Sequence, residues 1–319
     1  QRDDVRAVVL AAAGCAVGVH DAMPSPGRKF LLAGIGGTGI VTVNQVLATA
    51  ALRAGYEVES LDQIGLSQKA GPVVSHLRFS TSALEPSNRL TSGSADCIIA
   101  IDLLTATDNR NLAYGNAERT VAVASTSQTP TGDMVYDKSV AYPETQLLLD
   151  RLTAATRTLT HFDALAAAQA LFGNTAAANF LVVGAAFQNG GLRLPEASIE
   201  EAIGINGVAV AANVAAFRWG RVAVADPAAF AAAVAAARPK AVPALARPEL
   251  LASTTFDGEV RRLVELRAGE LVGYQNAKVA RRYVETVQAV WQLERTITDN
   301  TAFDDTFLME AGNKNTYLQ

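Results

Sequence analysis

The sequence predicts an α/β fold: a Rossmann-like, doubly wound and mostly parallel sheet with helices on both faces, followed by a C-terminal helical segment. Between residues 29 and 222, apolar runs of strand length alternate with helical stretches, which is typical of a parallel sheet covered by helices. The first run leads into a turn with the spacing G-x-G-x-x-G. Helical periodicity resumes at about residue 256, after an Ala- and Pro-rich stretch, and this indicates a separate helical segment.

The glycine turn lies between a strand expected at about 29–33 and a helix expected at about 38–54. Its glycines are Gly34, Gly36, Gly37 and Gly39. Glycines at this spacing let the chain turn tightly and let a phosphate approach the backbone, and the free N–H groups at the helix start then face an anion. We therefore expect these four residues to bind a cofactor, with a purely structural strand–helix turn as the alternative.

The second expected strand, 56–61, ends at Asp62, about where a nucleotide-binding unit places its ribose-binding carboxylate. Asp62 is the fifth candidate cofactor-binding residue; its alternative role is to cap the turn. The next strand, 73–79, alternates with a period of two, which predicts one face that is wetter than the other. This alternation departs from a simple dinucleotide-binding fold, in which a helix and a buried strand would follow.

The rest of the first domain continues the alternation. The run 97–101, which contains Cys97, is continuously apolar and predicts a buried parallel strand with Asp102 at its carboxyl end. We expect a helix at about 103–113 and strands at 119–124 and 158–162. An apolar helical block from 163 to 219 then covers the sheet.

The expected domain boundaries follow from composition. Residues 1–28 form a leader, and 29–222 form the Rossmann-like domain. An Ala/Pro-rich linker covers 223–255 and is expected to contain at most one alanine helix. A helical segment and tail occupy 256–319. A chain that begins with Gln also suggests a fragment of something longer.

Composition excludes several functions. A net charge of −4 does not indicate the basic patch that proteins usually need to bind nucleic acid. Two cysteines provide neither a disulfide framework nor the four thiolates of an iron–sulfur cluster, and three scattered histidines show no metal-ligand spacing. The one candidate membrane segment, 7–19, is too short to span a bilayer and lacks the flank of a secretory signal, so we expect no membrane contact and a cytoplasmic location.

Two specific motifs carry a family resemblance. Residues 65–71 read Gly-Leu-Ser-Gln-Lys-Ala-Gly and are followed closely by Val-Val-Ser-His-Leu-Arg at 73–78. With the glycine turn, they resemble the gamma domain of 2-oxoacid:ferredoxin oxidoreductases, closest to the fused indolepyruvate ferredoxin oxidoreductases. In that group the loop reads G-L-A-Q-K-G-G before V-V-S-H-V-R, so Ala70 replaces a glycine. Stretches at 194–221 and 274–283 are also similar, and the resemblance spans roughly 29–295.

The resemblance implies a function. Such enzymes decarboxylate a 2-oxoacid on thiamine diphosphate, pass electrons through iron–sulfur clusters to ferredoxin and transfer the acyl group to coenzyme A. This chain has no Gly-Asp-Gly thiamine-binding signature and no cluster cysteines. The resemblance therefore implies a gamma portion with no catalytic residue, no metal and no tightly bound cofactor of its own, with coenzyme A as a possible ligand.

The implied partners are thiamine-binding and ferredoxin-like domains or subunits of the same enzyme, and ferredoxin itself, in an oligomer. Near such a partner, Lys69, His76 and Arg78 are the candidate interface or anion contacts. Lys69 is a mobile point charge, and His76 could titrate near neutrality. The alternative for all three is a polar sheet face covered by another domain. Two further functions remain open: an NAD-dependent dehydrogenase with a helical C-terminal domain, and a nucleotide-binding or scaffold module without chemistry.

Overall fold

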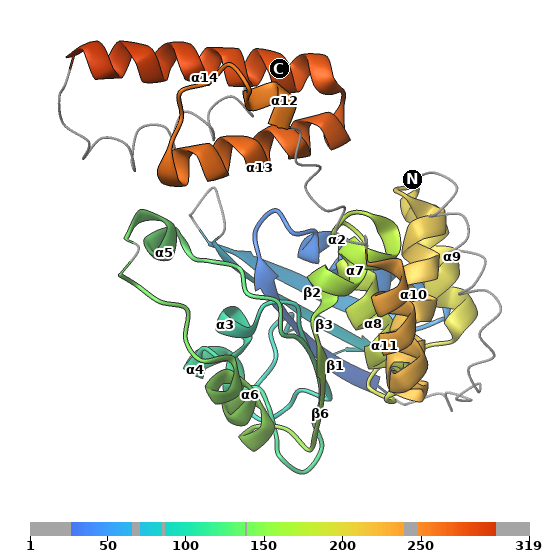
Figure 1. Cartoon of the computed structure of the whole chain (residues 1–319). Coiled ribbons are helices and arrows are strands. Elements are labelled where there is room, and N and C mark those ends of the chain that lie inside the picture. Colours follow the sequence, from blue (N-terminus) through green and yellow to red (C-terminus); the bar gives the residue numbers. More distant parts are fainter. Residues whose placement is uncertain (1–26, 66–70, 85–86, 138, 239–247, 298–319) are drawn as a thin grey trace. The chain divides into compact units, whose positions relative to one another are not determined.

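A computed structural model of the chain describes residues 27–65, 71–84, 87–137, 139–238 and 248–297. The chain divides into two compact units, 1–238 and 239–319 (Figure 1). Across the described residues, no helix combines the length and the apolar character that crossing a membrane requires.

The first unit is built on a six-stranded sheet with the order β2-β3-β1-β4-β5-β6. Neighbouring strands β1, β4, β5 and β6 pair in parallel, whereas β3 is antiparallel to both β1 and β2. The mostly parallel sheet predicted from the sequence is therefore confirmed, with one reversed strand inserted beside β1. The strands are β1 (Gly27–Ile35), β2 (Glu57–Ile64), β3 (Pro72–Ser80), β4 (Cys97–Ala100), β5 (Val121–Ser125) and β6 (Thr158–Phe162).

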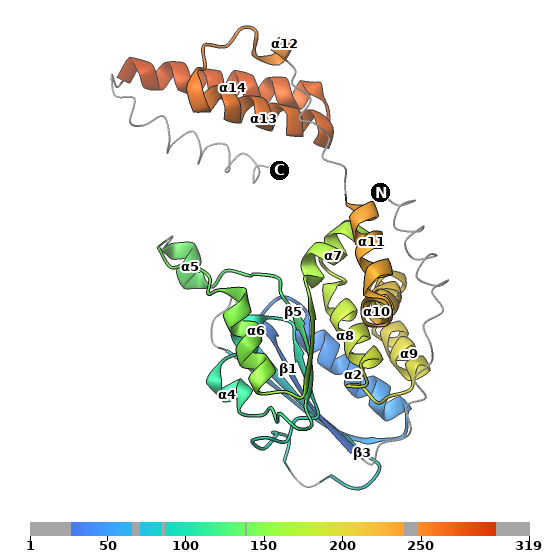
Figure 2. The same cartoon turned by 60° about the horizontal axis from the view of Figure 1, so that its bottom comes forward.

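Helices cover both faces of this sheet (Figure 2). One face carries α2 (Ile40–Arg53), α7 (Ala164–Phe172), α8 (Ala178–Gln188), α9 (Glu196–Asn206), α10 (Val210–Ala225) and α11 (Pro227–Ala237). The opposite face carries α3 (Leu103–Ala106), α4 (Asn109–Leu112) and α6 (Thr145–Ala154), and the chain between β5 and α6 forms α5 (Gly132–Tyr136).

The two faces make two separate hydrophobic cores because successive side chains of a strand point to opposite sides. Phe30 and Leu32 of β1 lie in the larger core under α2 and α8, whereas Leu31 and Ala33 lie in the smaller core under α3 and α6. All four are fully buried. A continuous apolar run is the pattern expected for a strand that is covered on both sides.

Helices α8 and α10 approach unusually closely at a pair of glycines. A Cβ atom added to Gly184 would lie 1.9 Å from the carbonyl oxygen of Phe217, and one added to Gly220 would lie 1.9 Å from that of Leu181. Any side chain at either position would therefore overlap the backbone of the other helix. Because both residues are glycines, the two helix backbones can lie in direct contact in the centre of the covering layer.

Three elements differ from the sequence-based expectations. The helix expected at 103–113 is two short helices, α3 and α4, because Asp108 interrupts it and caps α4 through a bond from the N–H of Arg110 to its Oδ1 (2.9 Å). Strand β2 continues to Ile64 and so contains Asp62. Helix α11 lies in the expected linker and packs on the first unit through Phe230, whose ring contacts those of Phe162 and Trp219.

Strand β3 is buried on both faces, which corrects the expectation of a wetter side. Val73, Leu77 and Phe79 lie in the larger core. His76 and Arg78, on the face expected to be wetter, are 0% and 9% exposed. The alternation marks polar side chains with specific partners inside the protein, not contact with water.

The second unit is a small helical unit with its own core. It comprises α12 (Pro248–Leu251), α13 (Gly258–Tyr274) and α14 (Ala277–Ile297). Gln275 and Asn276 separate α13 from α14, so the described part of the expected helical segment contains a pair of helices. Its core includes Phe256, Val264 and Trp291, and the rings of Phe256 and Trp291 meet edge to face with centroids 6.0 Å apart.

Candidate functional site

The candidate site lies at one edge of the sheet, where β1, β4, β5 and β6 have their carboxyl ends. The reversed direction of β3 brings its first residue, Pro72, to the same edge, paired with Ile35 at the end of β1. Open α/β sheets bind their ligands at this edge. The glycine turn, the connection between β2 and β3, and Asp102 after β4 therefore come together here.

The glycine turn connects β1 to α2 on this edge. Gly37 and Gly39 have positive φ angles of 85° and 87°, which residues other than glycine adopt at a cost. The N–H of Gly36 donates to the carbonyl oxygen of Gly71 (2.8 Å) and so ties the turn to the start of β3. A Cβ on Gly34 would lie 3.0 Å from Cδ1 of Ile40, so this glycine allows α2 to sit close on the strand.

The start of α2 has no side-chain cap. Gly39 occupies the N-cap position without a capping side chain, so the first N–H groups of the helix face the site edge without intrahelical partners. Asn179 of α8 holds the turn in place, because its Nδ2 donates a hydrogen bond to the carbonyl oxygen of Thr38 (2.6 Å). The sequence did not single out Asn179 as a site residue; its only signal was an amide among apolar residues at the start of α8.

Asp62 holds α2 and the strands together. Its Oδ1 accepts hydrogen bonds from Nδ2 of Asn44 on α2 (2.9 Å) and from the hydroxyl of Ser75 on β3. In a nucleotide-binding unit the acid follows the strand beside β1, but here β3 lies between β1 and β2. The arrangement gives no support to a ribose-binding role, nor to the dehydrogenase alternative that depended on it.

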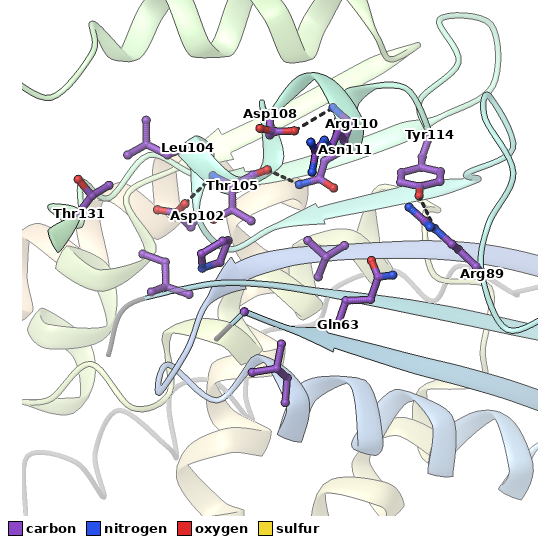
Figure 3. Close-up of a pocket in the computed structure, with 15 residues that line it drawn as sticks. Gln63, Arg89, Asp102, Leu104, Thr105, Asp108, Arg110, Asn111, Tyr114 and Thr131 are labelled. Atoms are coloured by element: carbon purple, nitrogen blue, oxygen red, sulfur yellow. Dashed lines mark hydrogen bonds between the residues drawn. The ribbon is translucent and has the colours of Figure 1, made fainter. Parts of the chain in front are cut away.

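A cavity of about 580 Å³ opens at the same edge, on the face covered by α3 and α4 (Figure 3). Figure 3 shows Asp102 and Thr131 at one end of it, Arg89 with Tyr114 at the other, and Arg110 and Asn111 between them. Five apolar side chains contribute to its walls: Ile35, Ile64, Pro72, Val74 and Leu104.

Asp102 is the buried acid of this cavity. It is 3% exposed, and its Oδ1 caps α3 by accepting from the N–H of Thr105 (2.7 Å). Burial raises the pKa of Asp102 above the usual range of a carboxyl group, an effect that the bond from Thr105 only partly offsets. Burial and, secondarily, the negative charge of Asp102 raise the pKa of the Tyr142 hydroxyl to about 12.

His76 does not titrate near neutrality, which corrects the sequence-based expectation. Its ring is fully buried, packs edge-on against Tyr114 with centroids 5.1 Å apart, and accepts a long hydrogen bond from the N–H of Leu90 at Nδ1 (3.5 Å). Burial, and secondarily the positive charge of Arg89, lower the pKa of His76 to about 4. His76 is therefore neutral at physiological pH.

Arg78 is engaged inside the chain. Its Nη1 forms an ion pair with Oε2 of Glu59 on β2 (3.1 Å) and donates to the carbonyl oxygen of Ser87. Arg78 and His76 thus fix the loop after β3 and the neighbouring strand. Lys69, the third residue of this set, lies outside the described residues.

The described residues contain no group of three or more His, Cys, Asp or Glu side chains arranged to hold a metal ion. Cys97 lies in β4 and is fully buried. Burial raises the pKa of its thiol to about 12, whereas a cluster ligand must be a thiolate. Its environment is that of a small core residue.

Comparison with known proteins places the chain in context. A family model described as pyruvate ferredoxin/flavodoxin oxidoreductase matches residues 29–223. The chain is 29% identical over 184 residues to the indolepyruvate oxidoreductase subunit IorB of Thermococcus kodakarensis, and the match covers 56% of this chain and 85% of that protein. It is 27% identical over 175 residues to the IorB subunit of Archaeoglobus fulgidus, covering 55% and 83% of the two chains.

A solved structure is also similar. The gamma subunit of a keto/oxoacid ferredoxin oxidoreductase from Geobacter sulfurreducens aligns with a TM-score of 0.44 at 19% identity, covering 62% of this chain and 98% of that one. The residues that the family model matches, 29–223, fall within the first unit.

Proposed function

We propose that this chain, which belongs to the pyruvate ferredoxin/flavodoxin oxidoreductase family as a gamma subunit or domain, serves an indolepyruvate-type enzyme. That enzyme would oxidatively decarboxylate aryl-2-oxoacids to acyl-coenzyme A with ferredoxin as the electron acceptor. The observation that carries the proposal is the similarity to the IorB subunit over 85% of that protein's length.

The cofactors that perform the redox chemistry do not fit this chain. An iron–sulfur cluster takes four cysteine thiolates, whereas the chain has two cysteines, and Cys97 is buried with a raised thiol pKa. No Gly-Asp-Gly thiamine-binding motif occurs in the sequence. Thiamine diphosphate and the clusters therefore belong to partner subunits or domains in this proposal, and the isolated chain is expected to be inactive.

In this proposal the chain binds coenzyme A and positions it at the edge of the sheet where the parallel strands have their carboxyl ends. The glycine turn offers the N–H groups at the start of α2, where the helix dipole favours a negative group, and the phosphates of coenzyme A are the candidate anions. Gly34, Gly36, Gly37 and Gly39 keep the approach free of side chains. The partners are the thiamine-binding and ferredoxin-like subunits, in an oligomeric enzyme of the cytoplasm.

The first experiment reconstitutes the enzyme. Coexpression of the full chain with a thiamine-binding partner subunit should give a complex that contains thiamine diphosphate and iron and reduces ferredoxin when indole-3-pyruvate and coenzyme A are both present. The chain alone should show no reduction. A purified complex that lacks both iron and thiamine diphosphate, or that is indifferent to every aryl-2-oxoacid, would contradict the proposal.

The second experiment tests contact with coenzyme A in that complex. A Cβ at Gly36 would lie 3.5 Å from the carbonyl oxygen of Gly71, so Gly36→Val adds methyl groups at the turn with limited crowding. We expect the KM for coenzyme A to rise about tenfold while the KM for the 2-oxoacid stays constant, because losing one phosphate contact costs on the order of 1–2 kcal/mol. A folded Gly36→Val complex with an unchanged KM for coenzyme A would refute this contact.

A further inference from the structure

A second cavity lies at the opposite edge of the sheet from the glycine turn, where β1 begins and β3 ends. Its volume is about 330 Å³, at the lower end of the range of about 300–1,000 Å³ that is usual for ligand pockets. Ala83 and Leu84, from the chain that follows β3, also line it. The cavity therefore suits a small ligand, and the function proposed above does not involve it.

Four of the residues that line this second cavity are cations: Arg28, Lys29, Arg78 and Arg119. Asp96 is the one acidic residue among the described residues that line it. The chain as a whole carries a net charge of −4, so this concentration of positive charge is a local feature. A hollow lined by charges of one sign concentrates ions of the other sign, and the lining therefore favours an anion.

The carboxylate of Asp96 is already engaged by the chain itself. Its Oδ1 accepts from Nη2 of Arg119 (2.6 Å) and lies 3.5 Å from Nη1 of Arg28, and its Oδ2 accepts from the backbone N–H of Lys29 (2.9 Å). Burial lowers the pKa of Arg28, and Asp96 partly offsets this effect. The positive charges of Arg193 and Arg119 lower that pKa further, so a bound anion would relieve repulsion among the three arginines.

Lys29 is the cation of the second cavity with the least compensation. It lies directly opposite Arg78 in the register of β1 and β3, and like charges directly opposite each other destabilise an antiparallel pair. Arg78 has a counter-charge in Glu59 on the neighbouring strand β2 (3.1 Å). The Lys29 ammonium forms no ion pair with any described residue. An anion in the cavity would supply the counter-charge for Lys29.

The balance of charge indicates which anion fits. The four lining cations are offset by two carboxylates, those of Asp96 and Glu59, which leaves two positive charges. A phosphate monoester carries about −1.5 to −2 at neutral pH, and its oxygens are good acceptors for both arginine and lysine. We propose that the second cavity binds the phosphate group of a small molecule, with Lys29, Arg28 and Arg119 donating to its oxygens. The source is either inorganic phosphate or a small phosphate ester.

Isothermal titration of the full chain at low ionic strength tests this proposal without turnover. Inorganic phosphate, glycerol 3-phosphate and acetate are the probes. We expect saturable binding of at least one of the two phosphates, weakened by added NaCl because salt screens the charges. Acetate, with a single charge, should bind at least tenfold more weakly. Tighter binding of glycerol 3-phosphate than of inorganic phosphate would identify an ester as the source, and the reverse order would identify inorganic phosphate.

The decisive variant is Lys29→Gln, because it removes a charge of the cavity without breaking an ion pair between described residues. We expect affinity for the phosphate probe to fall about tenfold, since the bonds to a charged group are the strong ones. Arg119→Gln is a second, independent variant. It removes a cation and also leaves Asp96 with less compensation, so it should weaken binding at least as much. Far-UV circular dichroism checks that each variant is folded.

The matched control is Lys278→Gln in α14 of the second unit. Lys278 is exposed, and its substitution changes the net charge of the chain by the same amount as Lys29→Gln. The control should bind phosphate within twofold of the wild type. Phosphate held only at the glycine turn would be insensitive to Lys29→Gln, so folded Lys29→Gln and Arg119→Gln chains that bind like the wild type would overturn the proposal. Failure of both phosphates to bind at millimolar concentration, or equal losses in the two lysine variants, would do the same.

Discussion

His76 shows how burial decides the role of a residue. Histidine in water titrates at about 6.5, so its place in a polar motif suggested a charge near neutrality. In the structure, Tyr114 and the backbone at Leu90 cover the ring, and the pKa falls to about 4. The folded chain therefore holds His76 neutral under conditions in which the unfolded chain would begin to protonate it.

This difference predicts a pH dependence of stability. Between pH 6.5 and about 4, His76 is protonated in the unfolded state but stays neutral in the folded state. The free energy of unfolding therefore falls as the pH is lowered through this window. The full loss amounts to about 3 kcal/mol. Urea unfolding of the wild type and of His76→Gln between pH 4 and 7 checks it: the variant should show a flatter profile over this range.

The control for this prediction is His161→Gln, which removes an exposed histidine from β6. Its pH profile should follow that of the wild type. Parallel profiles for the wild type and His76→Gln would show that His76 is not the group responsible.

Some residues of the site could be predicted from the sequence and others could not. The glycines of the turn were predictable because their spacing follows from local backbone geometry, and Asp102 because it directly follows an apolar run. Asn179 and the partners of Asp62 were not predictable, since they depend on contacts between segments far apart in the chain. The same is true of the burial of His76 and Arg78.

At the scale of elements, the contact between α8 and α10 depends on two glycines. Gly184 and Gly220 each face a backbone carbonyl of the other helix at a distance that leaves no room for a methyl group. Closely packed interiors relax little, so a side chain here must move one helix relative to the other. Both helices contribute to the larger core over the sheet.

We predict that Gly184→Ala destabilises the first unit by about 3 kcal/mol or more, at the upper end of what overpacking usually costs. Chemical denaturation monitored by far-UV circular dichroism measures the effect. The matched control is Gly204→Ala in α9, where an added Cβ meets no atom within 4 Å. Alanine there should stabilise by about 0.5–1 kcal/mol because of its higher helix propensity, and equal effects of the two substitutions would contradict the packing argument.

Which elements could be predicted depended on whether their signal was local. Strands β4 and β5 are short apolar runs, and α2 has a clear helical period, so their type and approximate position followed from the sequence. The antiparallel direction of β3 did not, because pairing direction is set by tertiary contacts. The division into α3 and α4 depends on capping by Asp108, which the apolar periodicity of 103–113 conceals.

At the scale of the whole molecule, each compact unit contains one of the two tryptophans. Trp219 lies in α10 of the first unit and Trp291 in α14 of the second. The second unit has a much smaller core, and small cores give less stability. The two units are therefore expected to unfold at different denaturant concentrations.

Single-tryptophan chains test this expectation. Fluorescence of Trp219→Phe reports on the second unit, and fluorescence of Trp291→Phe reports on the first. We expect the Trp219→Phe signal to change at a lower urea concentration, with a smaller m-value because less surface becomes exposed. Coincident transitions in both chains would show that the two units unfold cooperatively as one.

The composition of residues 223–255 differs from that of the surrounding sequence. The division between compact units falls after Arg238, within that stretch. Helix α11 was expected at most as an alanine helix in a linker, but Phe230 anchors it to the first unit. One aromatic residue in an alanine-rich sequence is a weak signal, and its meaning depends on where the partner rings lie.

The reversed strand β3 has a consequence for how such a protein can diversify. A hairpin inserted beside β1 adds a loop to the functional edge, and both ends of that loop are fixed: Gly36 donates to Gly71, and Gly65 donates to Pro72. Insertions or deletions between these anchors need not disturb the register of the sheet. A change in the length of this loop is therefore separated from the strand pairing by hydrogen bonds at both of its ends.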